Sequence, residues 1–179
     1  MSPRRRTTIA VLGDGVWGTT LAIHLHHLGH QVRWWGAFPE YVALIARRRQ
    51  NPKYLPDVPI PTSLPITSDL PEAVAGAQLI VLAVPSQFLR RVVRQIPRAT
   101  ARRAILVNVA KGLEVGSLGR MSEVITQELG SARLAVLSGP NIASEIARGF
   151  PASSVVASRR AAPAKTVQPA LIGGHLRLY

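Results

Sequence analysis

The sequence contains no cysteine and no long apolar run. Without cysteine, neither disulfide bonds nor thiolate metal sites can stabilise the chain. The apolar stretches at residues 9–12 and 79–84 are too short to cross a bilayer, which takes about 20 apolar residues in a helix. The basic residues 1–7 are not followed by the apolar core and small-residue cleavage site of a signal peptide. We therefore expect a soluble protein of the cytoplasm.

Acidic and aromatic side chains are also scarce. Nine Asp and Glu residues stand against 22 Lys and Arg residues, so the formal net charge is +13. Such an excess of positive charge suggests nucleic acid as a partner. Most of the arginines, however, fall into five separate groups, and few aromatic residues interleave them, so no stacking surface for bases is indicated. We expect no nucleic-acid partner; the opposite hypothesis predicts salt-sensitive binding to any duplex.

What the sequence does contain is enough apolar residues for one packed domain, at 47% of 179 residues. Near its start the chain reads I-A-V-L-G-D-G-V-W-G. Gly13 allows a sharp turn out of a buried strand, Gly15 lets the backbone approach a pyrophosphate, and Gly18 lets a helix pack closely on the strand. The N-terminus of that helix then presents N–H groups and a positive dipole end to phosphates.

Segments with strand and helix patterns alternate along the chain. Strands are predicted at residues 9–12, 31–35, 79–84, 104–109, 134–137 and 153–157, and helices at 17–28, 40–50, 71–77, 88–96 and 121–129, with a short helix ending at 148. This alternation predicts an α/β fold: a Rossmann-like, doubly wound, mostly parallel sheet with helices on both faces. We expect one domain at residues 8–158, a basic tail at 1–7, and a divergent tail at 159–179 with a last helix (161–171) and strand (175–179).

Unusual residues follow several of the predicted strands, where ligands bind on such sheets. They are the glycine turn, Pro85-Ser86-Gln87, Lys111-Gly112 and residues 138–141. Ser86 is expected to cap the helix that follows it. Because the chain has so few lysines, Lys111 at a strand end suggests a place that requires a compact point charge.

Four histidines crowd the first helix and its end: His24, His26, His27 and His30. Pairs at this spacing can chelate a metal ion, but no cysteine or nearby carboxylate completes a ligand set. We expect a solvated helix edge and no metal site.

Six motifs together resemble the bacterial NAD(P)-dependent glycerol-3-phosphate dehydrogenases: G-D-G-V-W-G-T-T-L-A, N-P-K-Y-L-P, V-P-S-Q, A-K-G-L-E, R-M-S-E-V-I and L-S-G-P-N-I-A-S-E-I-A-R-G-F-P. The similarity extends over about residues 8–158. It implies reversible reduction of dihydroxyacetone phosphate to sn-glycerol 3-phosphate for phospholipid synthesis, with NAD or NADP as cofactor. It also implies an N-terminal cofactor domain and a helical C-terminal domain that completes the substrate site.

The resemblance implies that the glycine turn, with Val16 and Trp17, lines the cofactor phosphates. Val16 stands where the family usually has serine, so it offers only its backbone N–H. Just past the second strand the family commonly carries Arg or His near the adenosine ribose, whereas this chain has Gly36-Ala37-Phe38. Ala37 offers neither an acid for a ribose hydroxyl nor a base for a 2′-phosphate, so NAD and NADP both stay open.

By the same resemblance, Tyr54 and the backbone of Ala143 line the cofactor site. Lys111 is implied to contact both cofactor and substrate and to polarise the carbonyl that accepts hydride. Gly139 and Asn141 match positions that hold the substrate. Asn141 replaces the usual serine or threonine, and its amide still supplies a donor and an acceptor.

The resemblance places the general acid/base of the family beyond Tyr179. The family continues into a G-A-L-K-N motif, whose lysine has that role, and the motif does not occur in these 179 residues. Hydride transfer needs a proton source within reach of the substrate. We therefore assign no catalytic residue within the chain, and we expect it to bind cofactor and to be inactive alone.

Two alternatives accompany this interpretation. The first is a non-catalytic nucleotide-binding or interaction module left by truncation. The second is another β-hydroxyacid-type dehydrogenase, which is disfavoured because K-G-L-E and S-G-P occur together.

Overall fold

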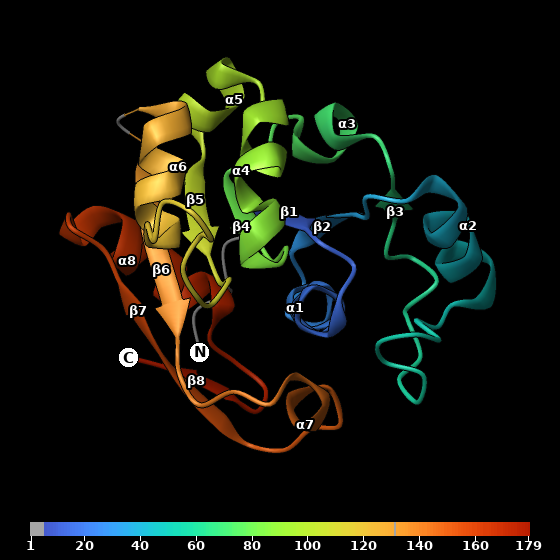
Figure 1. The fold of residues 1–179 in the computed structure, drawn as a ribbon. Helices are drawn as coiled ribbons and strands as arrows, with labels where there is room; N and C mark the ends of the chain where they lie inside the picture. The colour runs from blue at the N-terminus through green and yellow to red at the C-terminus, as the bar shows by residue number, and fades with distance from the viewer. Residues whose placement is uncertain (1–5, 131) are drawn as a thin grey trace.

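The computed structural model describes residues 6–130 and 132–179, and within them the strands form one eight-stranded sheet (Figure 1). The strand order is β3-β2-β1-β4-β5-β6-β7-β8. All neighbours pair in parallel except β6 and β7, which are antiparallel. The strands are β1 (Thr8–Leu12), β2 (Gln31–Trp35), β3 (Ile66–Thr67), β4 (Leu79–Leu82), β5 (Ile105–Asn108), β6 (Arg133–Ser138), β7 (Ala152–Ala157) and β8 (Leu176–Leu178).

Helices cover both faces of this sheet. One face packs against α1 (Val16–His27), α2 (Pro39–Arg48), α7 (Ala143–Ala147) and α8 (Ala161–Leu171). The other packs against α3 (Leu70–Val74), α4 (Ser86–Gln95), α5 (Arg98–Arg103) and α6 (Met121–Leu129), which lie together at the top of Figure 1. The predicted doubly wound, mostly parallel α/β fold is confirmed.

The alternation of side chains along β1 explains why both faces need a cover. Ile9 and Val11 join the apolar core on the α1 side, whereas Ala10 and Leu12 join the core on the α4 side, and all four are fully buried. Successive side chains of a strand point to opposite faces, so a continuous apolar run marks a strand covered twice. The same pattern recurs in β4, whose four residues are buried.

Most predicted elements occur within one or two residues of their expected bounds, and β2, α6 and α8 match them. Among the predicted elements, α3 is the exception, since it ends at Val74 rather than at residue 77. The helix α4 is displaced by two residues at its start. It begins at Ser86 rather than Phe88, with Pro85 at the N-cap and no side-chain cap bond, so the predicted capping role of Ser86 is wrong. The chain enters this helix directly from Pro85, which places Ser86 inside the first turn.

The last predicted strand is shorter than expected. β8 covers Leu176–Leu178, whereas the pattern predicts residues 175–179. Tyr179 still follows the ladder to β7: its N–H donates to the carbonyl oxygen of Ser154 at 3.0 Å, and its own carbonyl oxygen accepts from the N–H of Val156 at 2.7 Å. The backbone of Tyr179 therefore extends the pairing of β8 with β7 by one residue.

The histidines at the end of α1 are not simply a solvated edge. His30 is 4% exposed, and its Nε2 lies 2.8 Å from the carbonyl oxygen of Ala170. Nε2 of His24 lies 2.9 Å from the carbonyl oxygen of Leu171. Both contacts reach the last turn of α8, where carbonyl oxygens have no N–H partner within the helix. The expectation of a solvated edge was therefore wrong for His30, which ties α8 to the core.

In the part of the chain that the structure describes, no helix combines the length and apolar character needed to cross a membrane.

Candidate functional site

The glycine turn (residues 13–18) connects β1 to α1, and its backbone is packed too closely for a side chain at two of its glycines. Gly13 has a φ of 127°, and a Cβ there would lie 2.5 Å from the carbonyl oxygen of Ala83. A Cβ on Gly18 would lie 2.0 Å from the carbonyl oxygen of Gly13. The buried indole of Trp34 donates to that same oxygen at 2.8 Å. These contacts hold the turn against β2 and against the segment after β4.

Gly15 faces open space instead. A Cβ added there would meet no atom within 4 Å. Gly15 is the extended N-cap of α1, so the amide groups that follow it lack acceptors within the helix. The first turn of α1 carries no acidic side chain. Unpaired N–H donors at the positive end of a helix, with room in front of them, are suited to bind a phosphate group.

A cavity of about 390 Å³ opens in front of this helix terminus. It lies beyond the carboxyl ends of β1, β4, β5 and β6, at the point where the strand order reverses between β1 and β4. Open α/β sheets bind ligands at such a point. Of the residues predicted from the sequence, those in its walls are Gly15, Val16, Trp17, Lys111, Asn141 and Ala143; Gly13, Gly18, Ala37, Tyr54 and Gly139 are not in them.

The resemblance gives Tyr179 no role in the site, and its position in the structure is away from the cavity. The resemblance places the general acid/base beyond residue 179, and Tyr179 itself is absent from the walls of this cavity. Its side chain is 72% exposed, while its backbone is bonded to β7. The structure therefore gives Tyr179 a place in the sheet and no contact with the candidate site.

Lys111 connects the loops that follow β5 and β6. Its side chain is exposed, and its Nζ donates to the carbonyl oxygen of Gly139 at 2.8 Å. Gly139 is packed closely on β7, because a Cβ there would lie 2.8 Å from the carbonyl oxygen of Ser153. An ammonium group has three donors, so the bond to Gly139 leaves two for a ligand in the cavity.

Asn141 and Ala143 are held by their own contacts beside the cavity. Nδ2 of Asn141 donates to Oγ of Ser154 at 2.5 Å, while its Oδ1 is buried with no hydrogen-bond partner among the described residues. The carbonyl oxygen of Ala143 accepts from Oγ1 of Thr20 at 3.1 Å, which fixes α7 against α1. Asn141 thus keeps an unused acceptor next to a cavity wall.

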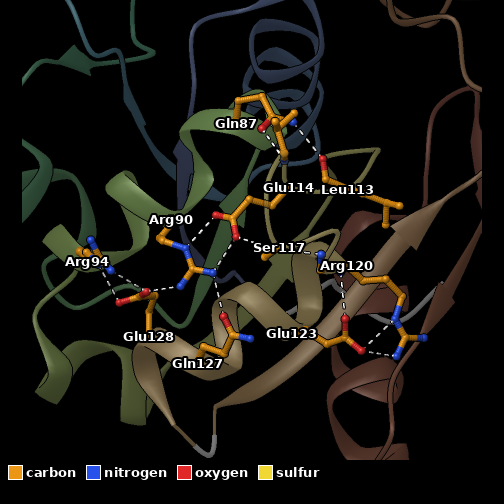
Figure 2. Close-up of polar contacts among 12 residues, drawn as sticks. Gln87, Arg90, Arg94, Leu113, Glu114, Ser117, Arg120, Glu123, Gln127 and Glu128 are labelled. Atoms are coloured by element: carbon orange, nitrogen blue, oxygen red, sulfur yellow. Dashed lines mark hydrogen bonds and ion pairs between the residues drawn. The ribbon is translucent and has the colours of Figure 1, made fainter.

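Side chains from α4 clamp the loop that follows Lys111, as Figure 2 shows. Gln87 donates from Nε2 to the carbonyl oxygen of Leu113 and accepts from the N–H of Val115, both at 2.9 Å. Arg90 donates from Nε and Nη2 to the two carboxylate oxygens of Glu114, each at 2.7 Å. The bidentate pair fixes both the distance and the plane of the carboxylate.

The same cluster extends to α6 (Figure 2). Glu128 accepts from Arg90 and from Nε of Arg94, the latter at 2.8 Å, and Oε1 of Gln127 accepts from Arg90 at 2.7 Å. The Arg90 guanidinium, helped by the Ser117 hydroxyl, lowers the pKa of Glu114 to about 2. The loop that carries Lys111 is therefore anchored to α4 by charged hydrogen bonds, and α4 is joined in the same way to α6.

Tyr54 lies outside the walls of this cavity, in the loop between α2 and β3. Its ring is 41% exposed and stands edge-on to Tyr41, with 6.2 Å between centroids, and Nζ of Lys53 lies 5.0 Å from its centroid. Asn51 anchors this loop to the glycine turn. Its Nδ2 donates to the carbonyl oxygen of Asp14 at 2.8 Å and to Oγ1 of Thr19 at 2.7 Å.

Three of these supports were missed by sequence reasoning: Asn51, Trp34 and the Gln87–Arg90 pair. Asn51 begins the N-P-K-Y-L-P motif and is fully buried, and a polar residue at the start of such a motif was the available signal. Trp34 is the penultimate residue of β2, and nothing in the sequence indicates that its indole N–H reaches the glycine turn. Arg90 and Gln87 read as an ordinary polar helix face, because their partners lie 24 to 38 residues further along the chain.

A second cavity, of about 420 Å³, opens at the opposite edge of the sheet, beside the first residues of β4, β5 and β6. None of the residues predicted to bind a ligand lies in its walls. Ligand sites on parallel sheets occur at the carboxyl ends of strands. We therefore take the cavity at the glycine turn as the functional site, although it is slightly smaller.

The strand order, the glycine turn and the cavity at the switch point define a dinucleotide-binding domain of the Rossmann class. Residues 8–164 match the family described as NAD-dependent glycerol-3-phosphate dehydrogenase N-terminus. The chain belongs to this family.

Relatives support the same assignment. A glycerol-3-phosphate dehydrogenase (NAD(P)+) of Thermoanaerobacter sp. is 43% identical over 171 residues, covering 96% of this chain and 51% of the relative. That of Nocardia farcinica is 47% identical over 180 residues, covering 97% and 53%. The crystal structure of glycerol-3-phosphate dehydrogenase from Coxiella burnetii superposes with a TM-score of 0.90 at 32% identity, covering 97% of this chain and 53% of that one. The chain spans about half the length of the relatives it matches.

Proposed function

We propose that this chain binds NAD(H) or NADP(H) along the carboxyl edge of its sheet and is the cofactor-binding half of an enzyme that interconverts dihydroxyacetone phosphate and sn-glycerol 3-phosphate. The observation that carries the proposal is the open side of Gly15 at the N-terminus of α1, facing a cavity that also holds Lys111. The relatives' names supply the reaction. Together, the cavity and the relatives' names suggest which residues of the cavity wall bind the cofactor and which bind the substrate.

Residues in different parts of the proposed site have different roles. The backbone N–H groups of Val16 and Trp17 bind the pyrophosphate at the helix terminus, where the dipole favours negative charge. The Ala143 backbone, in the cavity wall, and Tyr54, outside it, would also contact the cofactor. The nicotinamide, when bound, supplies or accepts the hydride.

Lys111 supplies the positive charge next to the reacting atoms of the substrate. Its ammonium group, oriented by the Gly139 carbonyl at 2.8 Å, donates toward the substrate oxygen on which negative charge develops. Asn141, which lines the cavity and is held by Ser154, orients the substrate through its side-chain amide. Lysine is suited to this place because its compact charge can donate in several directions.

We further propose that these 179 residues bind the dinucleotide with negligible turnover by themselves. The support is the coverage: the relatives are about twice as long as the segment matched here. In the resemblance, the lysine that handles the proton belongs to the G-A-L-K-N motif, which is not in this sequence. A bound substrate without a proton source in reach does not react at an enzymatic rate.

Titration of the purified chain with NADH and with NADPH, followed by nicotinamide fluorescence, tests the proposal. We expect saturable binding of at least one of them, and no turnover of dihydroxyacetone phosphate above the uncatalysed rate. A folded sample that binds neither nucleotide would contradict the cofactor role. Rapid turnover by the pure chain would contradict the need for a further domain.

A further inference from the structure

Asp14, between the first two glycines of the turn, has a carboxylate oxygen with no partner. Its Oδ2 is buried and makes no hydrogen bond among the described residues. The Asp14 backbone is fixed, because its carbonyl oxygen accepts from Nδ2 of Asn51 at 2.8 Å. Burial raises the pKa of the Asp14 carboxyl, while a backbone hydrogen bond and the charge of Lys53 act in the opposite direction. A buried acceptor left unpaired is costly, so the position of this oxygen calls for an explanation.

The carboxylate occupies the space beside Gly36, directly after β2. A Cβ added to Gly36 would lie 2.8 Å from Oδ2 of Asp14 and 2.6 Å from Cγ2 of Val42. The absence of a side chain at Gly36 is what admits the carboxylate. β1 and β2 are paired neighbours, with Leu12 opposite Trp35, so the turn after β1 and the end of β2 meet at the same edge.

The end of β2 is where this class of fold distinguishes its two cofactors. An acid there accepts hydrogen bonds from the ribose hydroxyls of NAD, and a cation there accommodates the 2′-phosphate of NADP. The chain has Gly36, Ala37 and Phe38 at this place, with no charged side chain. Asp14 brings a carboxylate to the same place from the neighbouring turn.

We propose that Asp14 is the cofactor-selecting residue of this domain: its carboxylate accepts a hydrogen bond from the adenosine ribose of NAD and excludes the 2′-phosphate of NADP. The inference rests on the proposed function. A ribose hydroxyl can donate to the carboxylate of Asp14, which is only partly buried, whereas a phosphate at the same place sets two negative charges against each other.

The competing cation is Lys53. Its side chain is exposed, its ammonium group lies over the Tyr54 ring at 5.0 Å, and contact with Tyr54, followed by more distant charges that include Asp14, raises its pKa. Arg49, at the end of α2, is already bonded to the carbonyl oxygen of Leu64 at 3.0 Å. Lys53, whose charge acts on Asp14, is therefore the cation that we test for a preference for NADP.

The experiment compares the dissociation constants of NADH and NADPH for the purified chain and its variants, by fluorescence titration. In the native chain we expect NADH to bind at least about tenfold more tightly, about 1.4 kcal/mol. Asp14→Asn, which keeps the shape and removes the charge, is expected to reduce this ratio at least about fivefold. Asp14→Ala provides a second variant, and thermal melting confirms that each is folded.

Two further variants complete the experiment. One is a control, and the other is expected to reverse the cofactor preference. Asp57→Asn removes one negative charge from an exposed side chain, whose contact is with Arg148 at 3.1 Å, and is expected to leave the ratio unchanged. Ala37→Arg in the Asp14→Asn chain is expected to invert the ratio by supplying the missing cation.

The outcomes separate the inference from the function on which it rests. If both nucleotides bind but NADPH binds equally well or better, or if Asp14→Asn leaves the ratio unchanged, the inference fails and the cofactor role stands. A native preference for NADPH that Lys53→Gln removes would assign the selection to Lys53 instead. If the folded chain binds neither nucleotide, the proposed function fails and the inference with it.

Discussion

Gly15 and Gly18 belong to the same motif, but their surroundings indicate different roles: ligand binding for Gly15 and close packing for Gly18. A Cβ at Gly15 meets open space, whereas a Cβ at Gly18 lies 2.0 Å from a backbone oxygen. We therefore expect Gly15→Ala to fold normally and to weaken NADH binding at least about tenfold, because the methyl group fills the space for a phosphate. Gly18→Ala is expected to lower the free energy of unfolding by about 1–3 kcal/mol or more, as overpacking does.

Urea unfolding and NADH titration of both variants check this contrast. Each variant is the control for the other, since both replace glycine by alanine in the same turn. Equal loss of stability in the two, or unchanged binding by Gly15→Ala, would mean that the open side of Gly15 is not a phosphate site.

Lys111 is exposed and donates to the Gly139 carbonyl, so its replacement should cost function more than stability. In an enzyme that joins this chain to the second half of a relative, Lys111→Ala is expected to lower kcat/KM by orders of magnitude. A loss below about tenfold, roughly 1.4 kcal/mol, would remove Lys111 from the site. Lys165→Ala, an exposed lysine on α8, is the matched control and should leave kcat/KM unchanged.

At the scale of elements, the ion pairs of Arg90 and Arg94 with Glu114 and Glu128 join α4 to α6 and to the loop after β5. They make the free energy of unfolding depend on pH. The pKa of Glu114 is lowered from 4.5 to about 2, mainly by Arg90. A carboxyl whose pKa is lower in the folded state stabilises the fold above its unfolded pKa. This contribution is therefore complete at neutral pH and is lost as the pH falls from about 4.5 toward about 2.

Glu114→Gln reveals this contribution in urea unfolding between pH 7 and pH 2. The native chain should be more stable than the variant at pH 7, and the difference should shrink through the window below about 4.5. Glu40→Gln, an exposed carboxyl on α2, is the control and should show a smaller difference at pH 7. A difference for Glu114→Gln that stays constant with pH would show that the ion pair does not stabilise the loop.

Elements with strong local signals could be predicted from the sequence, and those without could not. β1 and β4 are apolar runs followed by glycine or proline, and the alternation of strands with helices predicted the mostly parallel sheet. β3 is two residues long and α5 has one buried residue, Ala101, so neither carries a periodic pattern. The strand ends placed Lys111 and Asn141 near the glycine turn, because parallel strands share one edge.

What the sequence could not show is which distant side chains hold these residues in place. Asn51 reaches across 32 residues to Thr19, and Arg90 across 38 residues to Glu128. The same limit applies to Asp14, since the space beside Gly36 that admits its carboxylate exists only once β1 and β2 are paired. Such contacts depend on the completed fold, and no local pattern encodes them.

At the scale of the molecule, residues 159–179 belong to the core of the sheet. Val167, Leu171 and Leu176 are fully buried, and Leu178 is 2% exposed. α8 also supplies the carbonyl oxygens that meet the histidines of α1 and its end. We expect deletion of residues 159–179 to abolish cooperative unfolding, because each such side chain contributes roughly 1.5–3 kcal/mol to a domain that is stable by only about 5–15 kcal/mol.

Circular dichroism melting and binding of a dye for exposed apolar surface check this expectation. Since a truncated chain often aggregates, the point variant Leu171→Ala provides a milder test and should lower the free energy of unfolding by about 2–5 kcal/mol. Val155→Ala, on the neighbouring strand β7 and 54% exposed, is its control and should cost far less. If the truncated chain melts cooperatively at the native temperature, the domain ends near residue 158, and α8 with β8 is an appendage that only covers the sheet.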